Sequence, residues 1–386
     1  MKILIVRGYA SELKSNMYNL QEVGLAKSIV KMGHECDIVY YTKRKNIYVE
    51  TIQVGEKKIN IYWTPGLKVL NNSIYLNLIK NKFFDKYDVI QSNEYNQIMT
   101  WILPKITKTP VIIYHGPYSN GEKLNHKIFT KIYDFLFLKK IIKSVDSVIT
   151  KSKLASDYMK KKGFRNISTV GVGLDIDKFN KNSKNDSVES IIKNQIDKSK
   201  DKILLYVGRL DDDKKNIRFL IDIMKFINMK NKDVKLMLVG SCSDVKKKEL
   251  CDYTKDNNLN SNIIFINSIK QDELPELYKL ADVFVLPSVY EIFGMVILES
   301  MYFNLPVVSS VNGGSTTAIE NNYNGIIIKE FDAQEWSEKI IMIINDINKM
   351  NELSRNAHSC IIEDFTWDNL AYKFINIYKK AIKDYD

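Results

Sequence analysis

The sequence predicts an α/β protein of two doubly wound, Rossmann-like domains. Short, continuous apolar runs alternate along the chain with segments of helical periodicity, which is typical of parallel strands covered by helices on both faces. Both halves of the chain show this alternation, and a polar stretch at 180–202 separates them. At 386 residues the chain is also long for a single hydrophobic core.

Five apolar runs predict the strands of the first half: KILIV, CDIVYY, DVIQS, PVIIYH and DSVITKS. Five more do so in the second half: KILLYVG, VKLMLVG, NIIFI, DVFVLPS and PVVSS. Between the first two of these, the apolar residues at 217, 220, 221 and 224 lie on one face of a predicted helix. Strand–helix–strand units of this kind build parallel sheets.

The domain boundaries follow from the polar stretch. We predict a first domain at 1–180, a linker at 181–201, a second domain at 202–365 and a last helix at 366–386.

The composition is that of a packed globular protein, with 45% hydrophobic residues. The net charge of +11 suits nucleic acid, anionic lipid or phosphorylated ligands and does not choose among them. The four cysteines form no C-x-x-C pair, which favours free thiols in a reducing cytoplasm. No apolar run approaches the about 18 residues of a membrane-spanning helix. The run in MKILIVRGYA ends at Arg7 and predicts a strand, not a signal peptide.

The turn after the first strand of the second half combines basic residues with the start of a helix. In KILLYVGRLDDDKKNIRFLI, Asn216 stands at a favourable N-cap position. Arg209, Lys214 and Lys215 therefore lie between the carboxyl end of a strand and a helix N-terminus, where fixed cations and backbone N–H groups suit a phosphate. The alternative is a solvated basic turn paired with 211–213.

Two glutamates occur in the apolar stretch SVYEIFGMVILES at 288–300. Glu291 follows a predicted buried strand, in a loop before a helix that begins near Gly294. Glu299 lies within that helix among apolar neighbours, so its carboxylate needs hydrogen-bond donors. Sugar hydroxyl groups are one source of donors. The alternatives are a structural partner for Glu299 and a favourable helix-dipole position for Glu291.

These stretches resemble the donor-binding signature of retaining glycosyltransferases of family 4. The resemblance rests on Glu291 and Glu299, with seven residues between them in PSVYEIFGMVILESMYFNLPVVSS, and on Gly313, Gly314 and NNYNGIII after them. It extends to VGRL…KKN, LPELYKLADVFVLPS and FTWDNLAYKF, and in the first half to VIIYHG and VGVGLDIDKF. It thus covers nearly the whole chain and implies the GT-B fold, an α/β fold in which two Rossmann-like doubly wound domains face a central cleft. The resemblance also implies that the first domain binds the acceptor, that the second binds the nucleotide sugar, and that the last helix returns to the first domain.

The resemblance implies catalytic and phosphate-binding roles for matching residues. Glu291 faces the donor sugar, and His115, at the end of VIIYH, belongs to the same catalytic site. Arg209 and Lys215 hold the diphosphate. Lys214 is the alternative lysine, because the spacing from Arg209 is one residue longer than usual.

Backbone groups and the second glutamate complete the implied donor site. Phe293, Gly294 and Met295 meet the sugar and phosphate at the helix N-terminus, and Glu299 accepts hydrogen bonds from the ribose. Such proteins often carry a glycine pair after the first strand, whereas RGYASELKSNMYN contains only Gly8. Gly8 is assigned to the donor, and acceptor recognition is the alternative for its loop.

No metal and no cofactor are expected; the implied substrate is a UDP-sugar or another nucleoside diphosphate sugar. The triplet DID at 175–177 matches the D-x-D pattern by which GT-A transferases hold Mg²⁺ or Mn²⁺. It lies at the entry to the predicted linker, however, and such triplets arise readily by chance.

The sequence therefore favours a retaining hexosyltransferase that moves a sugar to a hydroxyl group of a glycan or lipid-linked acceptor in cell-surface polysaccharide synthesis. Two other classes stay open. A GT-B sugar-nucleotide epimerase would use the donor site without an acceptor. A non-enzymatic basic protein would bind nucleic acid with strong salt dependence, but it would not need the paired glutamates, so we expect no nucleic-acid partner.

The segments 127–143 and 67–84 mix basic with large apolar residues. Such segments can lie on anionic membrane surfaces, but we favour packing of their apolar positions on the sheet. We expect a cytoplasmic protein, with peripheral contact at the inner face of the cell membrane as the alternative.

Overall fold

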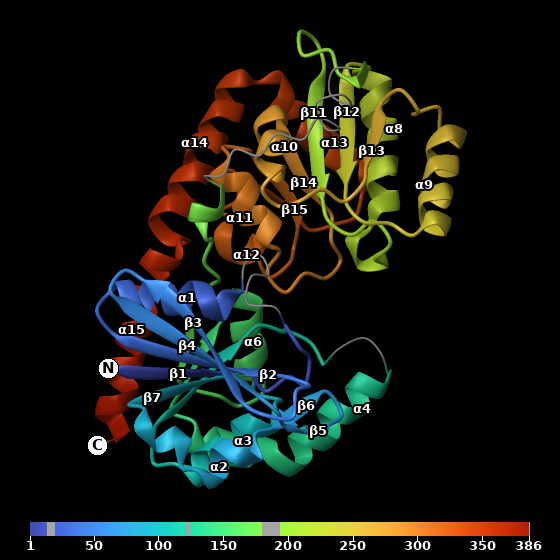
Figure 1. Cartoon of the computed structure of the whole chain (residues 1–386). Helices are drawn as coiled ribbons and strands as arrows, with labels where there is room; N and C mark the ends of the chain where they lie inside the picture. The colour runs from blue at the N-terminus through green and yellow to red at the C-terminus, as the bar shows by residue number, and fades with distance from the viewer. Residues whose placement is uncertain (14–19, 121–123, 180–193, 386) are drawn as a thin grey trace. The chain divides into compact units, whose positions relative to one another are not determined.

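The computed structural model describes residues 1–13, 20–120, 124–179 and 194–385, and it divides into two compact units (Figure 1). Unit 1 comprises Met1–Asp175 and Thr366–Asp386, and unit 2 comprises Ile176–Phe365. The chain thus leaves unit 1 at Asp175, before the predicted domain end at 180. Most of the predicted linker lies outside the described residues.

Unit 1 contains a sheet with the strand order β10-β9-β8-β7-β1-β2-β4-β3, in which every pair except β3–β4 is parallel. The apolar runs of the sequence correctly predict β1, β2, β7, β8 and β9, but they do not predict the antiparallel β3–β4 hairpin. The strands are β1 (Lys2–Val6), β2 (Glu35–Tyr41), β3 (Tyr48–Val54), β4 (Lys57–Thr64), β7 (Val89–Asn93), β8 (Val111–His115), β9 (Ser147–Thr150) and β10 (Ile167–Thr169), with β5 (Leu67–Val69) and β6 (Asn72–Ile74) in a separate hairpin.

The helices of unit 1 include the last helix of the chain. Trp367 at its start packs closely on this unit, since a Cβ atom on Gly24 or Gly173 would lie 2.2 or 2.4 Å from the indole ring. The helical elements are α1 (Gln21–Lys31), α2 (Leu76–Lys80), η1 (Phe83–Lys86), α3 (Ile98–Ile106), α4 (Leu124–Tyr133), the π-helical η2 (Asp134–Leu138), α5 (Lys139–Ser144), α6 (Lys153–Lys161) and α15 (Trp367–Tyr385).

Unit 2 contains a wholly parallel sheet with the order β13-β12-β11-β14-β15-β16. Along the chain, β11, β12 and β13 follow one another toward one edge strand of the sheet. The order then reverses, and β14, β15 and β16 follow one another from β11 toward the other edge strand. The carboxyl ends of β11 and β14 therefore form the switch point at which open α/β sheets bind ligands. The strands are β11 (Lys202–Val207), β12 (Val234–Val239), β13 (Ile263–Ile266), β14 (Val283–Leu286), β15 (Val307–Ser310) and β16 (Ile326–Ile328).

The helices of unit 2 follow the predicted pattern. The first long one buries Ile217, Leu220, Ile221 and Met224, the apolar face that the sequence predicts. The helical elements are η3 (Ile176–Phe179), η4 (Asp213–Lys215), α8 (Ile217–Lys230), α9 (Asp244–Asp256), α10 (Leu274–Leu280), α11 (Met295–Tyr302), α12 (Ser315–Ala318), α13 (Ala333–Asn345) and α14 (Ile347–Asp364).

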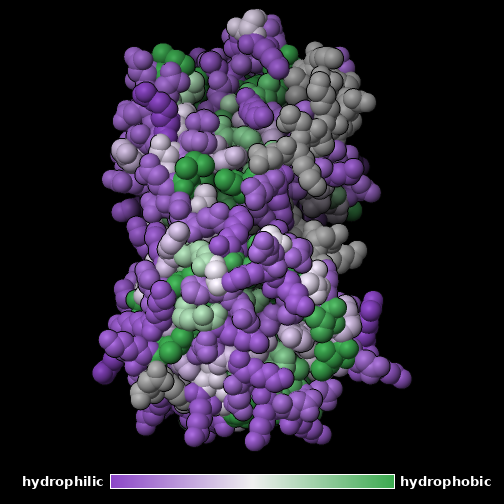
Figure 2. Space-filling model, turned by 60° about the vertical axis from the view of Figure 1, so that its left-hand side comes forward, coloured by the Kyte–Doolittle hydropathy of each residue, from purple (hydrophilic) through white to green (hydrophobic). Residues whose placement is uncertain are grey.

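The surface is mostly hydrophilic on the face shown in Figure 2, with small hydrophobic patches. Within the described ranges, no helix is long and apolar enough to cross a membrane. The predicted packing of 127–143 on the sheet is partly wrong. Tyr133 and Ile141 are buried, but Ile132 is 54% and Phe135 89% exposed, because the α4–η2–α5 segment turns only one side toward unit 1.

Candidate functional site

Two neighbouring central strands of unit 2 bring most of the predicted donor residues together at the carboxyl ends of the strands. β11 pairs with β14 in parallel, with Leu204 opposite Val283. Arg209 and Lys215 follow β11, and Glu291 follows β14. These side chains therefore lie at the switch point of the sheet.

The turn after β11 is held by its aspartates. Arg209 is largely exposed, and its Nε and Nη2 donate to Oδ1 of Asp211 at 3.3 and 3.2 Å. The Asp212 side chain accepts from the backbone N–H of Lys214 and caps η4. Asn216 does occupy the predicted N-cap position of α8, but it has a φ of 56° and makes no side-chain cap bond.

Lys215 contacts Glu291 directly. Its Nζ donates to Oε2 of Glu291, and the two side chains are only 18% and 19% exposed. Lys214 points elsewhere, with Nζ 5.1 Å from the centre of the Tyr290 ring. Of the two lysines that the sequence leaves open, Lys215 is therefore the one beside the glutamate.

Glycines fix the loop that carries Glu291. Gly294 is the N-cap of α11 with a φ of 74°, and a Cβ atom there would lie 2.8 Å from Cγ of Glu291. A Cβ atom on Gly313 or Gly314 would lie 1.9 or 1.7 Å from the carbonyl oxygen of Ile292 or Phe293. The predicted glycine pair therefore lets the backbone pack against the loop at 291–293. Phe293 is buried, and Met295 begins α11.

Glu299 is buried within α11, with 1% of its surface exposed. Its Oε2 accepts from the hydroxyl group of Tyr278 at 2.8 Å, and its Oε1 accepts from Nε2 of Gln271 at 3.4 Å. The donors that the sequence requires for this carboxylate are thus supplied at least in part by the protein.

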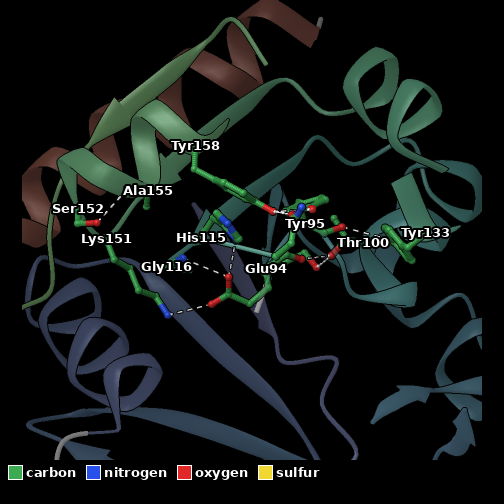
Figure 3. Close-up of polar contacts among 12 residues, drawn as sticks. Glu94, Tyr95, Thr100, His115, Gly116, Tyr133, Lys151, Ser152, Ala155 and Tyr158 are labelled. Carbon is green, nitrogen blue, oxygen red and sulfur yellow. Dashed lines mark hydrogen bonds and ion pairs between the residues drawn. The ribbon is translucent and has the colours of Figure 1, made fainter. Parts of the chain in front are cut away.

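In unit 1, the ends of three adjacent parallel strands bring His115 together with two residues that the sequence analysis missed. Glu94 follows β7, His115 ends β8, and Lys151 follows β9. Nδ1 of His115 lies 2.5 Å from Oε2 of Glu94, and Nζ of Lys151 lies 3.2 Å from Oε1 (Figure 3). The sequence signal that could have identified Glu94 and Lys151 is a charged residue directly after a predicted strand, as in DVIQSNE and DSVITK.

The His115 side chain is almost fully buried, at 1% exposure. The ring of Tyr95 meets the imidazole edge-on at 5.2 Å, and the ring of Tyr158 stacks on it at 5.9 Å. Burial alone would raise the pKa of the Glu94 carboxyl, but the charge of Lys151 and the contacts with His115 and the Gly116 backbone N–H outweigh it and lower that pKa to about 2. The carboxylate is therefore ionised at neutral pH.

Unit 1 also contains a cavity of about 410 Å³, lined in part by Tyr9, Leu70, Asn96, Gln97 and Phe129. Oδ1 of Asn96 and Oε1 of Gln97 are buried and have no hydrogen-bond partner within the described part of the chain.

Gly8 lies beside this cavity. A Cβ atom there would lie 3.1 Å from Cβ of Gln97, so the glycine allows a close approach of that side chain.

The aspartates of the D-x-D triplet belong to different units, Asp175 to unit 1 and Asp177 to unit 2. Asp175 lies 3.9 Å from Nζ of Lys27. Among the described residues, no group of three or more His, Cys, Asp or Glu side chains is placed to hold a metal ion.

Two family models match the chain. The model described as Glycosyltransferase Family 4 matches residues 23–178. The model described as Glycosyl transferases group 1 matches residues 187–359. Together they span most of the sequence.

Relatives of known sequence carry related names. Glycosyltransferase MJ1607 of Methanocaldococcus jannaschii is 35% identical over 189 residues, which is 47% of this chain and 46%, about half, of that relative. UDP-Gal:alpha-D-GlcNAc-diphosphoundecaprenol alpha-1,3-galactosyltransferase of Escherichia coli is 24% identical over 299 residues, 73% of this chain and 72% of that relative.

A solved structure shares the fold. HepE of Anabaena in complex with UDP superimposes with a TM-score of 0.73 at 18% identity, over 98% of this chain and 100% of that chain. At this identity the likeness concerns the fold alone.

Proposed function

The chain belongs to the family 4 glycosyltransferases of GT-B fold, and we propose on that premise that it transfers a sugar from a UDP-sugar to a hydroxyl group of an acceptor, with retention of configuration. The contact between Lys215 and Glu291 beside the N-terminus of α11 carries the proposal. It supports the proposal because Lys215 is the cation that we assign to the diphosphate and Glu291 is the carboxylate that we assign to the sugar. The complex of HepE with UDP supports the choice of nucleotide.

Stabilising the leaving diphosphate is the main demand of such a reaction. We assign this role to Arg209 and Lys215, because preorganised cations stabilise charge that develops on an oxygen in the transition state. The bond between the anomeric carbon and the diphosphate oxygen breaks, and the acceptor oxygen bonds to the anomeric carbon. The acceptor's proton passes to the leaving phosphate oxygen, so that UDP is released and no metal is needed.

The remaining donor residues position the sugar nucleotide. We assign Glu291 to the transferred sugar and the backbone at 293–295 to sugar and phosphate, since N–H groups at a helix N-terminus attract anions. Glu299 is assigned to the ribose, because a carboxylate accepts about four hydrogen bonds. His115 of unit 1 is assigned to a sugar hydroxyl group.

The cavity of unit 1 is proposed as the acceptor site. Asn96 and Gln97 offer buried oxygens that need donors, while Tyr9 and Phe129 offer aromatic rings. Amides with aromatic rings suit a neutral, hydroxyl-rich sugar. We assign Gly8 to the packing of Gln97 in this site and no longer to the donor.

The acceptor is proposed to be a glycan carried on a lipid, for the synthesis of cell-surface polysaccharide. The diphosphoundecaprenol-linked substrate in the name of the Escherichia coli relative supports this choice. Exposed Ile132 and Phe135 lie in the same segment as the exposed Lys131 and Lys139, and together they support peripheral contact of unit 1 with an anionic membrane.

A thermal-shift screen of the full chain against UDP-, GDP-, ADP- and CMP-sugars tests the proposal. We expect UDP-sugars to raise the melting temperature, because a ligand that binds only the folded state stabilises it. The stabilising UDP-sugar is then incubated with and without a diphosphoundecaprenol-linked acceptor. Acceptor-dependent release of UDP supports transfer, whereas an epimerised donor without acceptor would favour an epimerase. No response to any nucleotide would contradict the donor site.

A further inference from the structure

A buried carboxylate to which the proposed reaction gives no role lies beside His115. Glu94 is 5% exposed and has a backbone φ of 63°. Residues other than glycine adopt this left-handed conformation rarely, and bulky ones do so at a cost in free energy. Such strained residues cluster at functional sites, where the surrounding structure holds them in place.

Three donors converge on the two oxygens of Glu94. Oε2 lies 2.5 Å from Nδ1 of His115 and accepts from the backbone N–H of Gly116 at 3.1 Å. Oε1 accepts from Nζ of Lys151 at 3.2 Å (Figure 3). Only a carboxylate suits all three donors, since a glutamine would turn its NH₂ group toward either the ammonium or the backbone N–H.

The contact with Glu94 determines which nitrogen of His115 carries the proton. In a neutral imidazole one nitrogen donates and the other accepts, and the partner of the first fixes the tautomer. Because Oε2 of Glu94 only accepts, Nδ1 carries the proton and Nε2 becomes the acceptor. Nε2 has no hydrogen-bond partner among the residues that the structure describes.

The imidazole is also held in orientation. The rings of Tyr95 and Tyr158 contact it, and the two tyrosine hydroxyl groups lie 3.2 Å apart. An acceptor nitrogen that is buried without a partner costs free energy unless a ligand supplies the hydrogen.

We propose that Glu94 is a positioning residue that holds His115 with its proton on Nδ1 and presents Nε2 to a hydroxyl group of the sugar substrate. The hydroxyl group donates a hydrogen bond to Nε2, and no covalent bond changes at this site. Lys151 keeps Glu94 ionised in this arrangement. The substrate part of the inference rests on the proposed glycosyl transfer, whereas the tautomer does not.

The tautomer is measured by ¹⁵N NMR of the imidazoles in the full chain at a pH where they are neutral. The chain has four histidines, so each signal can be assigned with one substitution. Glu94→Gly removes the carboxylate and accepts the positive φ, which keeps the fold accessible, and Glu94→Ala is the second variant. Asp37→Asn is the control, a buried carboxylate of unit 1 that binds Tyr87 and Asn60.

We expect Nδ1 of His115 to be protonated in the wild type and in Asp37→Asn. In both Glu94 variants the proton should move mainly to Nε2, while the signal of His358 in unit 2 stays unchanged. With UDP-glucose as the donor probe, kcat for UDP release should fall about tenfold to 10²-fold in the Glu94 variants, the range for a misplaced group. KM for the donor should change less than kcat, because the hydroxyl contact with Nε2 is one of several proposed contacts to the donor.

A proton on Nε2 in the wild type, or an unchanged tautomer in Glu94→Gly, would overturn the positioning role. So would wild-type kcat in both variants while UDP still binds. Failure of the wild type to bind UDP in calorimetry would instead overturn the proposed function and the substrate part of this inference, and the tautomer result would stand by itself.

Discussion

The ammonium group of Lys215 contacts the carboxylate of Glu291, although the two residues are 76 positions apart in the sequence. The contact joins the end of β11 to the end of β14 at the switch point of unit 2. A diphosphate that binds here must share Lys215 with Glu291. Glu291 balances the lysine charge in this structure, and in the proposed reaction it lies next to the sugar when the donor is bound.

Glu291→Gln should lower kcat by roughly 10²-fold, because the carboxylate acts where positive charge builds on the transferred sugar. UDP should bind this variant at least as tightly as it binds the wild type, since UDP has no transferable sugar and its competitor for Lys215 is weakened. Steady-state kinetics and calorimetry test the two parts. Loss of UDP binding would contradict the assignment of Glu291 to the sugar.

Glu299→Gln should mainly raise KM for the donor, because the ribose is bound in substrate and product alike. A small fall in melting temperature is also expected, since Tyr278 and Gln271 are partners of this carboxylate. If Glu291→Gln and Glu299→Gln instead lose activity equally and in proportion to stability, both glutamates are structural.

Gly294→Ala should destabilise the protein by about 1–3 kcal/mol, because alanine is strained at positive φ. The added methyl group should also displace the Glu291 side chain, whose Cγ is 2.8 Å from the added Cβ atom. Urea unfolding and kcat test this pair of effects. Wild-type kcat in a folded variant would show that the Gly294 geometry does not position Glu291.

Transfer should persist in excess chelator. In the proposed reaction, Arg209 and Lys215 supply the charge that a metal would otherwise bring to the diphosphate. Initial rates of transfer are measured without chelator, with excess EDTA, and with EDTA followed by excess Mn²⁺. Complete loss of activity that Mn²⁺ restores would point to a metal-assisted reaction.

The stabilising effect of Glu94 should decline in acid. Its folded pKa of about 2 lies below the ordinary value of 4.5, so its contribution is fully present above pH 4.5 and is lost as the pH falls toward 2. The difference in free energy of unfolding between wild type and Glu94→Gln should narrow by about 2 kcal/mol between pH 7 and pH 3. A difference independent of pH would contradict the ion pair seen here.

Local sequence predicts much of the fold because buried parallel strands are continuous apolar runs. The ten strands expected from such runs are all present. The β3–β4 hairpin was not predicted, because residues of β3 alternate between exposed and partly buried positions and so form no continuous apolar run. Likewise, Asn216 is the N-cap of α8 as predicted, but its side chain makes no capping hydrogen bond. The residue type predicts the position and does not specify the backbone φ of 56° that Asn216 adopts.

Spacing within one motif predicts Glu291 and Glu299, but contacts across strands are a property of the topology. Glu94 and Lys151 are isolated charges in the sequence, and they meet His115 only because β7, β8 and β9 are neighbours. The Tyr278 partner of Glu299 likewise comes from another helix.

Arg209 and Lys215 are proposed to form the diphosphate site. Calorimetric titration of UDP into wild type, Arg209→Ala, Lys215→Ala, Lys214→Ala and Lys230→Ala tests it most directly, with Lys230 at the opposite end of α8 as the matched control. Arg209→Ala and Lys215→Ala should each weaken the affinity for UDP about tenfold or more, as expected for a lost charge-assisted hydrogen bond. The Lys230→Ala variant should bind UDP with the affinity of the wild type. Unchanged affinity for UDP in both Arg209→Ala and Lys215→Ala would contradict the assignment of these residues to the diphosphate. Weaker binding in Lys214→Ala alone would assign the diphosphate to Lys214 in place of Lys215.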